Sequence, residues 1–527
     1  MSLTVRDQLL ARAGDSRTGL LFEDASWTWD QVVRESVVRS AVLGDLLPAD
    51  APPHIGVLLD NNPEFTFLLG AVALGGRVLV GLNPTRRGAA LASDIARSDT
   101  QVVLTDAAYA GLLDDLDLPV PVVRIDQADW ARRLAAHAEA PVPDVEVGED
   151  TLMMLIFTSG TSGDPKAVNV TQVKVAFPGL FLSDRFGLGP DHVAYLSMPM
   201  FHSNAIMAGW GPALASGTTL ALARRFTASG FLADVRRFGA TYANYVGKPL
   251  TYIMATPERP DDADNPLRIV FGNEANERDI AEFGRRFGCV VVDSYSSTEN
   301  AVIVQRTDDM PPGSLGRPLD GVKVLDPETM AETPDAVFGP DGALLNADEA
   351  TGELVNTQGA GAFAGYYNDP DAEAERMRGG MYWSGDLAYR DADGFVYFAG
   401  RTADWLRVDG ENIAAAPVER ILLRHPAISE AAVYAVPDES VGDQMMAALT
   451  TLATLTPRDL EAFLADQSDL SPKAWPRYVR LVDALPRTAT NKVLKRQLAA
   501  EGPVAGDGTL WTRAARGTTY ATPSMVE

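Results

Sequence analysis

The sequence predicts an α/β protein with a large N-terminal domain of parallel-type sheets wound with helices and a smaller C-terminal α+β domain. Two observations support this fold class. Short β-branched runs alternate with helical patterns through most of the chain, and this alternation is typical of parallel sheets covered on both faces. The length of 527 residues is too great for one ordinary hydrophobic core, so we expect two or more domains.

The elements of the large domain follow from its apolar runs. Residues 63–76 and 277–288 show helical patterns, and in the second of these Ile280, Phe283 and Phe287 recur at the spacing of one helix face. Strands are expected at the apolar runs 55–60, 78–82, 101–106, 121–126, 152–157, 268–273 and 289–292. Helix and strand therefore follow one another as the fold class requires.

The small domain is expected to begin near residue 400. Beyond that point Pro417 begins a helical pattern, residues 431–436 form an apolar run, and residues 459–466 are helical again. The final stretch lacks periodicity and is expected to be a loosely attached tail. We therefore predict a large domain, a small domain and a tail over residues 1–400, 401–501 and 502–527.

Composition narrows the classes of function. The chain has 71 acidic and 45 basic residues and a net charge of −26, which repels nucleic acid and anionic lipid, so no nucleic-acid partner is expected. A bound anion would need a locally positive pocket. Cys289 is the single cysteine and excludes an internal disulfide. The first residues carry no signal-type apolar core, and glycines and Arg77 interrupt the longest apolar stretch, so we expect a cytoplasmic protein without an integral membrane segment.

A glycine- and hydroxyl-rich loop, TSGTSGDPK, follows the expected strand at residues 152–157. Glycines let backbone N–H groups turn toward an anion, hydroxyls add donors, and the lysine adds positive charge. The loop lacks the Gly-Lys-Ser/Thr triplet of the common nucleotide loop, and Pro165 blocks an immediate helix. By composition alone, an exposed glycine/serine turn fits equally well. The candidate phosphate ligands are Thr158, Ser159, Gly160, Thr161, Ser162, Gly163 and Lys166.

Three further segments carry candidate ligands. DSYSSTEN, residues 293–300, follows an apolar run and places Thr298 and Glu299 where a hydroxyl could contact phosphate and a carboxylate could hold Mg²⁺. Asp386, in YWSGDL, could accept both hydroxyls of a ribose. Lys492 lies in a polar loop near the end of the small domain. Taken singly, each of these also fits a turn former or a solvated lysine.

The order of the motifs is more specific than any one of them. TSGTSGDPK, PMFHSN, DSYSSTE, YWSGD, GRTADWLRVDG and TATNK resemble, in order and spacing, the core motifs of the adenylate-forming superfamily of acyl-CoA synthetases, nonribosomal peptide adenylation domains and luciferases. The resemblance covers roughly residues 10 to 500. Residues 271–288 and 393–419, and Ala167 after Pro-Lys, resemble the branch of fatty acid transport proteins and very-long-chain acyl-CoA synthetases.

This resemblance implies how ATP would be held. The loop from Thr158 to Lys166 would embrace the β- and γ-phosphates, while Thr298 would contact the α-phosphate and Glu299 would hold Mg²⁺. Asp386 and Arg401 would bind the ribose. Lys492 would bridge the substrate carboxylate and the α-phosphate. The adenine slot would be lined by Gly272, Asn273, Glu274, Ser294, Tyr295 and Ser296, with Tyr295 stacked on the base.

The resemblance also implies a mobile small domain that rotates between two half-reactions. Its rotation would bring the face around residues 400–412 inward, where Gly410 and Glu411 would lie against the pantetheine of CoA. Ala403 stands at the expected swivel, where many relatives carry Asp or Lys. Asn491 stands where many carry glycine before the lysine.

The acid substrate is expected to contact the segment PMFHSNAIMAGW. Phe201 and His202 occupy the place of an aromatic gate in relatives, although a histidine packed in a core is an equal alternative for His202. Ala205 and Met207 are small or adaptable and would allow a wide apolar cavity. Residues 199–209 contain no Asp that could hold an α-ammonium, which favours a fatty or bulky polycyclic acid over an amino acid.

We therefore predict an acyl-CoA synthetase that converts a hydrophobic carboxylic acid and ATP to an acyl-adenylate and pyrophosphate, and then transfers the acyl group to CoA. The alternative is an acyl-AMP ligase that stops at the adenylate or passes the acyl group to an acyl carrier protein. A catalytically silent relative is disfavoured because Lys166, Glu299, Asp386, Arg401 and Lys492 are all present. ATP, CoA and Mg²⁺ are the expected ligands, and a homodimer is left open.

Overall fold

The structure is a computed structural model in two compact units, residues 1–300 with 362–374, and residues 301–361 with 375–527. This division does not test the domain bounds predicted at residues 400 and 501, which stay predictions. The structure describes residues 3–158, 165–275, 277–307, 309–339, 344–401, 405–408, 411–438, 442–467, 470, 474–487, 493–506, 508–514 and 517–521.

The first unit is organised around two sheets that are parallel except for one antiparallel pair in each, β1–β2 and β7–β8. Among the described residues, one sheet has the order β13 (Val290–Asp293), β12 (Ile269–Asn273), β11 (Tyr242–Val246), β9 (Val193–Leu196), β10 (Thr219–Leu222), β1 (Thr18–Phe22) and β2 (Ala25–Thr28). The other described sheet has the order β6 (Val122–Arg124), β5 (Val102–Thr105), β3 (His54–Leu58), β4 (Val78–Gly81), β7 (Leu152–Thr158) and β8 (Lys166–Thr171). The predicted α/β class is confirmed.

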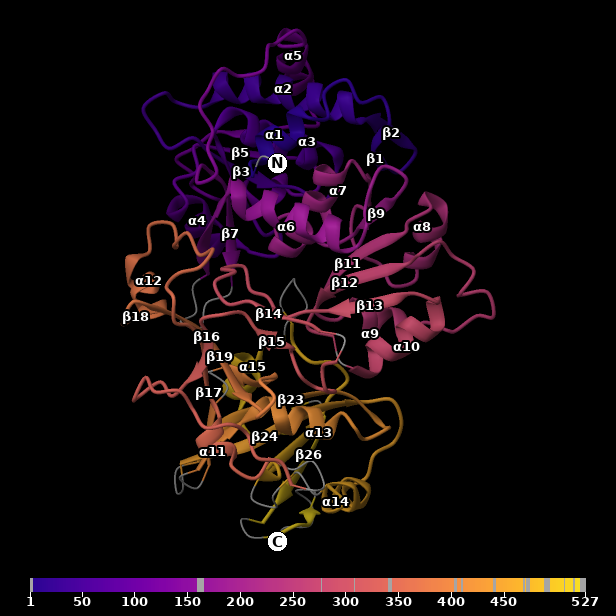
Figure 1. Ribbon diagram of the computed structural model, residues 1–527, viewed down its shortest axis with the longest axis vertical. Coiled ribbons are helices and arrows are strands. Elements are labelled where there is room, and N and C mark those ends of the chain that lie inside the picture. Colours follow the sequence, from indigo (N-terminus) through magenta and orange to yellow (C-terminus); the bar gives the residue numbers. More distant parts are fainter. Residues whose placement is uncertain are drawn as a thin grey trace. The chain divides into compact units, whose positions relative to one another are not determined.

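Helices fill the space between these two sheets, as Figure 1 shows for α1 (Val5–Leu10), α3 (Pro63–Gly75), α6 (Gln172–Arg185) and α7 (Gly211–Ser216). Buried side chains from these helices and from both sheets form one core, and α2 (Trp29–Leu46) and α5 (Ala128–Ala136) contribute Trp29 and Trp130 to it. The outer face of the β9–β13 sheet packs on α8 (Phe231–Phe238), α9 (Pro249–Met254) and α10 (Glu277–Phe287). Helix α4 (Gly88–Arg97) covers the other sheet.

The local sequence explains these elements. In β7 the run from Met153 to Ile156 is buried on both faces, as expected of a strand inside a covered sheet. On α10 the predicted face is confirmed, since Phe283 and Phe287 are buried and their rings lie 4.5 Å apart. The same helix carries a buried ion pair, in which Arg286 Nε lies 2.6 Å from Asp262 Oδ2.

Across its described residues, the second unit contains two five-stranded sheets of mainly antiparallel strands. The first joins β16 (Val322–Leu325), β17 (Gly352–Asn356), β18 (Met377–Arg378), β19 (Met381–Arg390) and β20 (Val396–Arg401). The second has the order β23 (Ile428–Asp438), β24 (Gly442–Thr451), β25 (Tyr478–Leu481), β26 (Thr509–Arg513) and β27 (Tyr520–Ala521). Two short pairs join β14 (Val304–Gln305) to β15 (Arg317–Pro318), and β21 (Trp405–Val408) to β22 (Glu411–Ala414).

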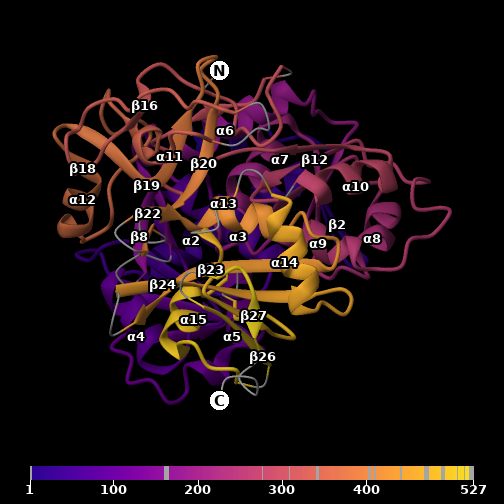
Figure 2. The ribbon, with the colours of Figure 1, turned by 90° about the horizontal axis from the view of Figure 1, so that it is seen from below.

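Helices cover both faces of the β23–β27 sheet. Side chains of α13 (Ala415–Leu422) and α14 (Pro457–Ala465) pack on one face, and Leu498 of α15 (Lys495–Glu501) packs on the other. Figure 2 shows α13 and α15 on opposite sides of β23 and β24. The short helices α11 (Ala347–Ala350) and α12 (Pro370–Arg376) lie earlier in the chain. Across the residues that the structure describes, no helix combines the length and apolar character needed to cross a bilayer.

The prediction that residues 502–527 form a loosely attached tail is wrong for its described part. Strand β26 pairs with β25 along Thr509–Arg513, and β27 pairs with β26. Trp511 and Tyr520 are 2% and 7% exposed and belong to the core on the α13 side of the sheet. The strands lack a clear period because they are short, and tertiary pairing with β25 decides their conformation.

Adjacent arginines on α10 allow a matched test of the buried ion pair. Arg286 and Asp262 side chains are 4% and 3% exposed, whereas Arg285 is 56% exposed and pairs with Glu258 at the surface. Replacing Arg286 with Ala leaves a buried carboxylate without its counter-charge and should lower the free energy of unfolding by about 3–5 kcal/mol. Arg285→Ala should cost at most about 1 kcal/mol. Urea unfolding of the two variants measures the difference, and equal losses would contradict the assignment.

Candidate active site

The predicted phosphate loop joins two paired strands. Strand β7 ends at Thr158 and β8 begins at Lys166, and these two residues are partners in the antiparallel register. The Thr158 hydroxyl donates to the Lys166 carbonyl at 3.4 Å, and Lys166 is 4% exposed. Ser159, Gly160, Thr161, Ser162 and Gly163 lie outside the described residues. The structure therefore fixes both ends of the loop and places its lysine at the base.

Thr298 and Glu299 follow the end of β13, as predicted. Thr298 is 8% exposed, and its hydroxyl lies 3.0 Å from that of Ser203, in the predicted acid-binding segment. Glu299 Oε1 accepts a hydrogen bond of 2.9 Å from the hydroxyl of Tyr366. Two predicted segments, PMFHSN and DSYSSTE, thus meet through side-chain hydroxyls.

Tyr366 connects two of the predicted ATP ligands. The ammonium of Lys166 lies over its ring, 5.4 Å from the ring centroid, and its hydroxyl donates to Glu299. Sequence reasoning missed Tyr366, because its role depends on an antiparallel bridge between Tyr366 and Val168, almost 200 residues apart.

A second buried lysine lies near Glu299. Lys174, on α6, is 3% exposed, and its Nζ donates to the carbonyl of Asn169 at 3.3 Å. Burial lowers the pKa of Lys174 to about 8, and the carboxylate of Glu299 opposes this shift. Sequence reasoning missed Lys174, since a lysine is usually solvated.

The predicted adenine residues lie at the ends of neighbouring strands. Gly272 and Asn273 end β12, and the Asn273 amide donates to the carbonyl and hydroxyl oxygens of Ser294 at 2.5 and 3.0 Å. A side chain at position 272 would meet the Tyr245 carbonyl oxygen at 2.2 Å, so the close approach of β11 requires glycine there. Glu274 has a φ of 66°, in the left-handed region.

Asp293 connects the two segments that carry the predicted adenine residues. Its Oδ2 accepts hydrogen bonds from the Tyr245 hydroxyl at 2.6 Å and from the Ala275 amide at 3.0 Å. Tyr295 is half-buried and Ser296 is exposed, which leaves both on the accessible side of this loop. The proposed stacking of Tyr295 on a base stays a prediction.

The predicted acid-binding segment is tightly packed. Phe201 and His202 are half-buried, and the Asn204 amide lies 3.4 Å from His202 Nδ1. The segment continues into a single π-helical turn, η2 (Ala205–Trp210), a feature frequent at functional sites. Ala205 is fully buried in the core between the two sheets, and Met207 packs against it.

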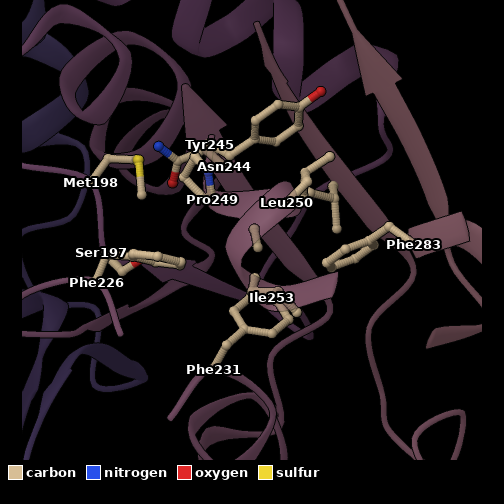
Figure 3. Close-up of a pocket in the computed structure, with 12 residues that line it drawn as sticks. Ser197, Met198, Phe226, Phe231, Asn244, Tyr245, Pro249, Leu250, Ile253 and Phe283 are labelled. Carbon is tan, nitrogen blue, oxygen red and sulfur yellow. The ribbon is translucent and has the colours of Figure 1, made fainter. Parts of the chain in front are cut away.

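A cavity with a volume of about 10 Å³ lies on the outer face of the β9–β13 sheet. Figure 3 shows the residues that line it. Phe226, Phe231 and Phe283 and the side chains of Leu250 and Ile253 surround it. It has room for about one water molecule, and Ala205 and Met207 are not among its lining residues, so it is not the predicted acyl cavity. Binding of acid by Phe201, His202, Ala205 and Met207 stays a prediction.

The second unit places two predicted ribose ligands on paired strands. Asp386 in β19 and Arg401 in β20 are partners in the antiparallel register, and Asp386 is 6% exposed. Sequence reasoning missed Glu353, whose Oε1 accepts a hydrogen bond of 2.6 Å from the Gly385 amide. Glu353 thereby fixes an irregularity in strand β19 before Asp386, where the register with β17 shifts and Gly385 has a φ of 75°.

Of the remaining predicted ligands of the second unit, Glu411 falls within the described residues. Glu411 begins β22. Gly410 and Lys492 lie outside the described residues, as do Ala403 and Asn491. Their predicted roles therefore stay predictions.

The donor set fits Mg²⁺ bound together with phosphate. Within the described residues, no three His, Cys, Asp or Glu side chains gather into a dedicated metal cage. Mg²⁺ with nucleotide is typically held by one or two carboxylates plus phosphate oxygens and water, a pattern that the single carboxylate of Glu299 fits. Around it stand the ammonium of Lys166 and the hydroxyl of Thr298, which suit the phosphates themselves.

Most of the chain matches known protein families. A family profile described as AMP-binding enzyme matches residues 8–367, and one described as AMP-binding enzyme C-terminal domain matches residues 417–492. A medium/long-chain-fatty-acid–CoA ligase from Mycobacterium marinum is 54% identical over 94% of this chain and 96% of its own. A steroid-22-oyl-CoA synthetase from Rhodococcus jostii is 49% identical over 94% of this chain and 90% of its own.

A solved structure shares the fold. ATP-bound MatB from Rhodopseudomonas palustris superposes with a TM-score of 0.82 at 22% identity, covering 95% of this chain and 99% of that one. These matches show that the chain belongs to the AMP-binding enzyme family, the adenylate-forming family that the order of its motifs predicted.

Proposed function

We propose that this protein is an acyl-CoA synthetase that converts a hydrophobic carboxylic acid, ATP and CoA to acyl-CoA, AMP and pyrophosphate. The observation that carries the proposal is the convergence of Lys166, Thr298 and Glu299 in the first unit of an AMP-binding enzyme. Two relatives that are about half identical are named as ligases of fatty and steroid acids, which supports a hydrophobic acid. CoA is the proposed acceptor, and the cytoplasm, where ATP and CoA are abundant, is the proposed location.

The first half-reaction needs charge stabilisation rather than a protein nucleophile. The substrate carboxylate is ionised at neutral pH, and one of its oxygens attacks the α-phosphorus of ATP while the bond to pyrophosphate breaks. Lys166 would neutralise the β- and γ-phosphates, Thr298 would donate to the α-phosphate, and Lys492 would bridge the two reacting anions. Asp386 and Arg401 would hold the ribose. Mg²⁺ held by Glu299 would offset negative charge on the departing pyrophosphate.

The second half-reaction transfers the acyl group. The sulfur of CoA attacks the acyl carbonyl as the thiol proton is released to solvent, and AMP leaves with the electrons of the broken acyl–phosphate bond. Gly410 and Glu411 would lie beside the pantetheine once the small domain has rotated. A carrier protein as the acceptor and a homodimer stay predictions.

Lys166→Ala tests the phosphate site. Loss of a charge that contacts two phosphates should raise the KM for ATP about 10- to 100-fold, because a hydrogen bond to a charged group contributes roughly 1.5–3 kcal/mol. Lys323 serves as the matched control, since its ammonium bonds Glu332 2.6 Å away in the second unit. Lys323→Ala should leave the KM unchanged. Steady-state kinetics with varied ATP compares the two, and an unchanged KM in Lys166→Ala would remove this lysine from the site.

Lys492→Ala separates the two half-reactions. A preorganised charge between two reacting anions is worth roughly 10²-fold or more in rate, so adenylate formation, measured by pyrophosphate release, should nearly stop. The same variant, given synthetic acyl-AMP and CoA, should form thioester at close to the wild-type rate, because Lys492 would point away from the site in that arrangement. Equal loss of both half-reactions would indicate structural damage. Wild-type enzyme that makes adenylate but not thioester would favour the acyl-AMP ligase.

The acid specificity can be read from a series of substrates. Each CH₂ buried in an apolar site contributes about 0.8 kcal/mol, so kcat/KM should rise about fourfold per methylene until the site is filled. Long-chain and polycyclic acids should therefore exceed acetate by orders of magnitude. Mass spectrometry of acyl-CoA products from an acid panel measures this. Preference for acetate or an amino acid would refute a hydrophobic acid site.

A further inference from the structure

Tyr366 is a buried side chain that no step of the proposed reaction uses. It is 4% exposed, its hydroxyl donates to Glu299 Oε1 at 2.9 Å, and the ammonium of Lys166 lies 5.4 Å from its ring centroid. A cation over a ring face and a carboxylate at the phenol oxygen are both favourable contacts. One side chain therefore touches both the proposed phosphate lysine and the proposed magnesium carboxylate.

The backbone around Tyr366 fixes its position. Val168 and Tyr366 form an antiparallel bridge, with the Asn169 amide donating to the Gly365 carbonyl at 3.1 Å and the Tyr367 amide donating to the Ala167 carbonyl at 2.8 Å. Residues 364–367 thereby extend the sheet beyond β8, its last strand in the described order.

Packing and conformation restrict the ring further. The ring of Phe363 meets that of Tyr366 edge-on, with centroids 4.9 Å apart. Gly365 has a φ of 86°, and a side chain there would come within 2.7 Å of Glu373. The tyrosine side chain is thus held by its backbone bridge and by Phe363 as well as by the charges that it contacts.

This geometry answers a problem that the site would otherwise have. A lysine and a glutamate that serve the same triphosphate attract each other, and a direct ion pair would have to be broken before ATP and Mg²⁺ could bind. The ammonium of Lys166 lies over the ring face, and the carboxylate of Glu299 accepts a hydrogen bond from the hydroxyl. Neither contact has to be broken when ATP and Mg²⁺ bind. The two groups are preorganised, which lowers the cost of binding.

We propose that Tyr366 is a positioning residue for adenylation, which orients Glu299 toward Mg²⁺ through its hydroxyl and Lys166 toward the phosphates through its ring. This inference rests on the proposed function. It assigns Tyr366 no contact with the reacting atoms. The two effects can be separated by substitution, because Tyr366→Phe keeps the ring and removes only the hydroxyl.

The test measures ligand binding directly. Titration calorimetry with α,β-methylene-ATP, which cannot release pyrophosphate, gives the affinity with and without Mg²⁺. In Tyr366→Phe the gain in affinity on adding Mg²⁺ should fall about tenfold, because the hydrogen bond to the carboxylate is lost, while affinity without Mg²⁺ stays near wild type. In Tyr366→Leu the affinity without Mg²⁺ should fall as well, by about fivefold, because the ring under Lys166 is lost.

Tyr367→Phe is the matched control. Tyr367 is the next residue on the same segment, and its hydroxyl donates to a different carboxylate, Asp99 Oδ2, at 2.8 Å. This variant should bind the analogue as wild type does, with and without Mg²⁺. If Tyr366→Phe matched wild type, or if both phenylalanine variants lost affinity equally, the positioning role would be overturned.

A second cycle tests the link to Glu299. In a Glu299→Gln background, Tyr366→Phe should no longer change the dependence of binding on Mg²⁺, whereas additive losses would overturn the link. Failure of the proposed function has a separate signature, since wild-type enzyme would then bind the analogue with Mg²⁺ but form no adenylate from any hydrophobic acid. In that case the Tyr366 measurements would still decide the positioning role.

Discussion

The candidate site depends on the antiparallel pairing of Thr158 with Lys166. This register returns the chain along the edge of a parallel sheet, so Lys166, the predicted phosphate ligand, is buried beside the end of β7. Because β8 then ends the described order of the sheet, its outer edge can accept residues 364–367, and these bring Tyr366 to Lys166. Glu299 joins through the tyrosine hydroxyl. One strand register thus places Lys166 and the edge that holds Tyr366, and a single hydrogen bond connects them to Glu299.

The net charge of the chain gives the burial of Lys166 a consequence for the binding of an anion. With a net charge of −26, the surface repels a polyanionic substrate at long range, and binding must rely on short-range contacts. Lys166 and Lys174 are 4% and 3% exposed, so their charges are poorly screened by water. The lowered pKa of Lys174 records the cost of that burial.

Sequence patterns predicted what is local. Apolar runs predicted β7 and β12, helical spacing predicted the buried face of α10, and motif order predicted the family. Patterns could not predict contacts that depend on how distant segments pair. Tyr366 reaches Glu299 across 67 residues, Glu353 reaches the Gly385 amide across 32, and Lys174 is buried only because α6 lies between two sheets. Strand β26 was missed because its conformation is decided by pairing with β25.

The first unit is discontinuous in the chain, since residues 362–374 complete what residues 1–300 begin. During synthesis, β8 emerges well before the segment that pairs with its outer edge. At about 5–20 residues per second, the roughly 200 residues between Val168 and Tyr366 take about 10–40 s to make. For that interval the nascent protein carries an unpaired sheet edge, a surface prone to association with other chains. The bridge between Val168 and Tyr366 can cover this edge only after residues 364–367 have been made.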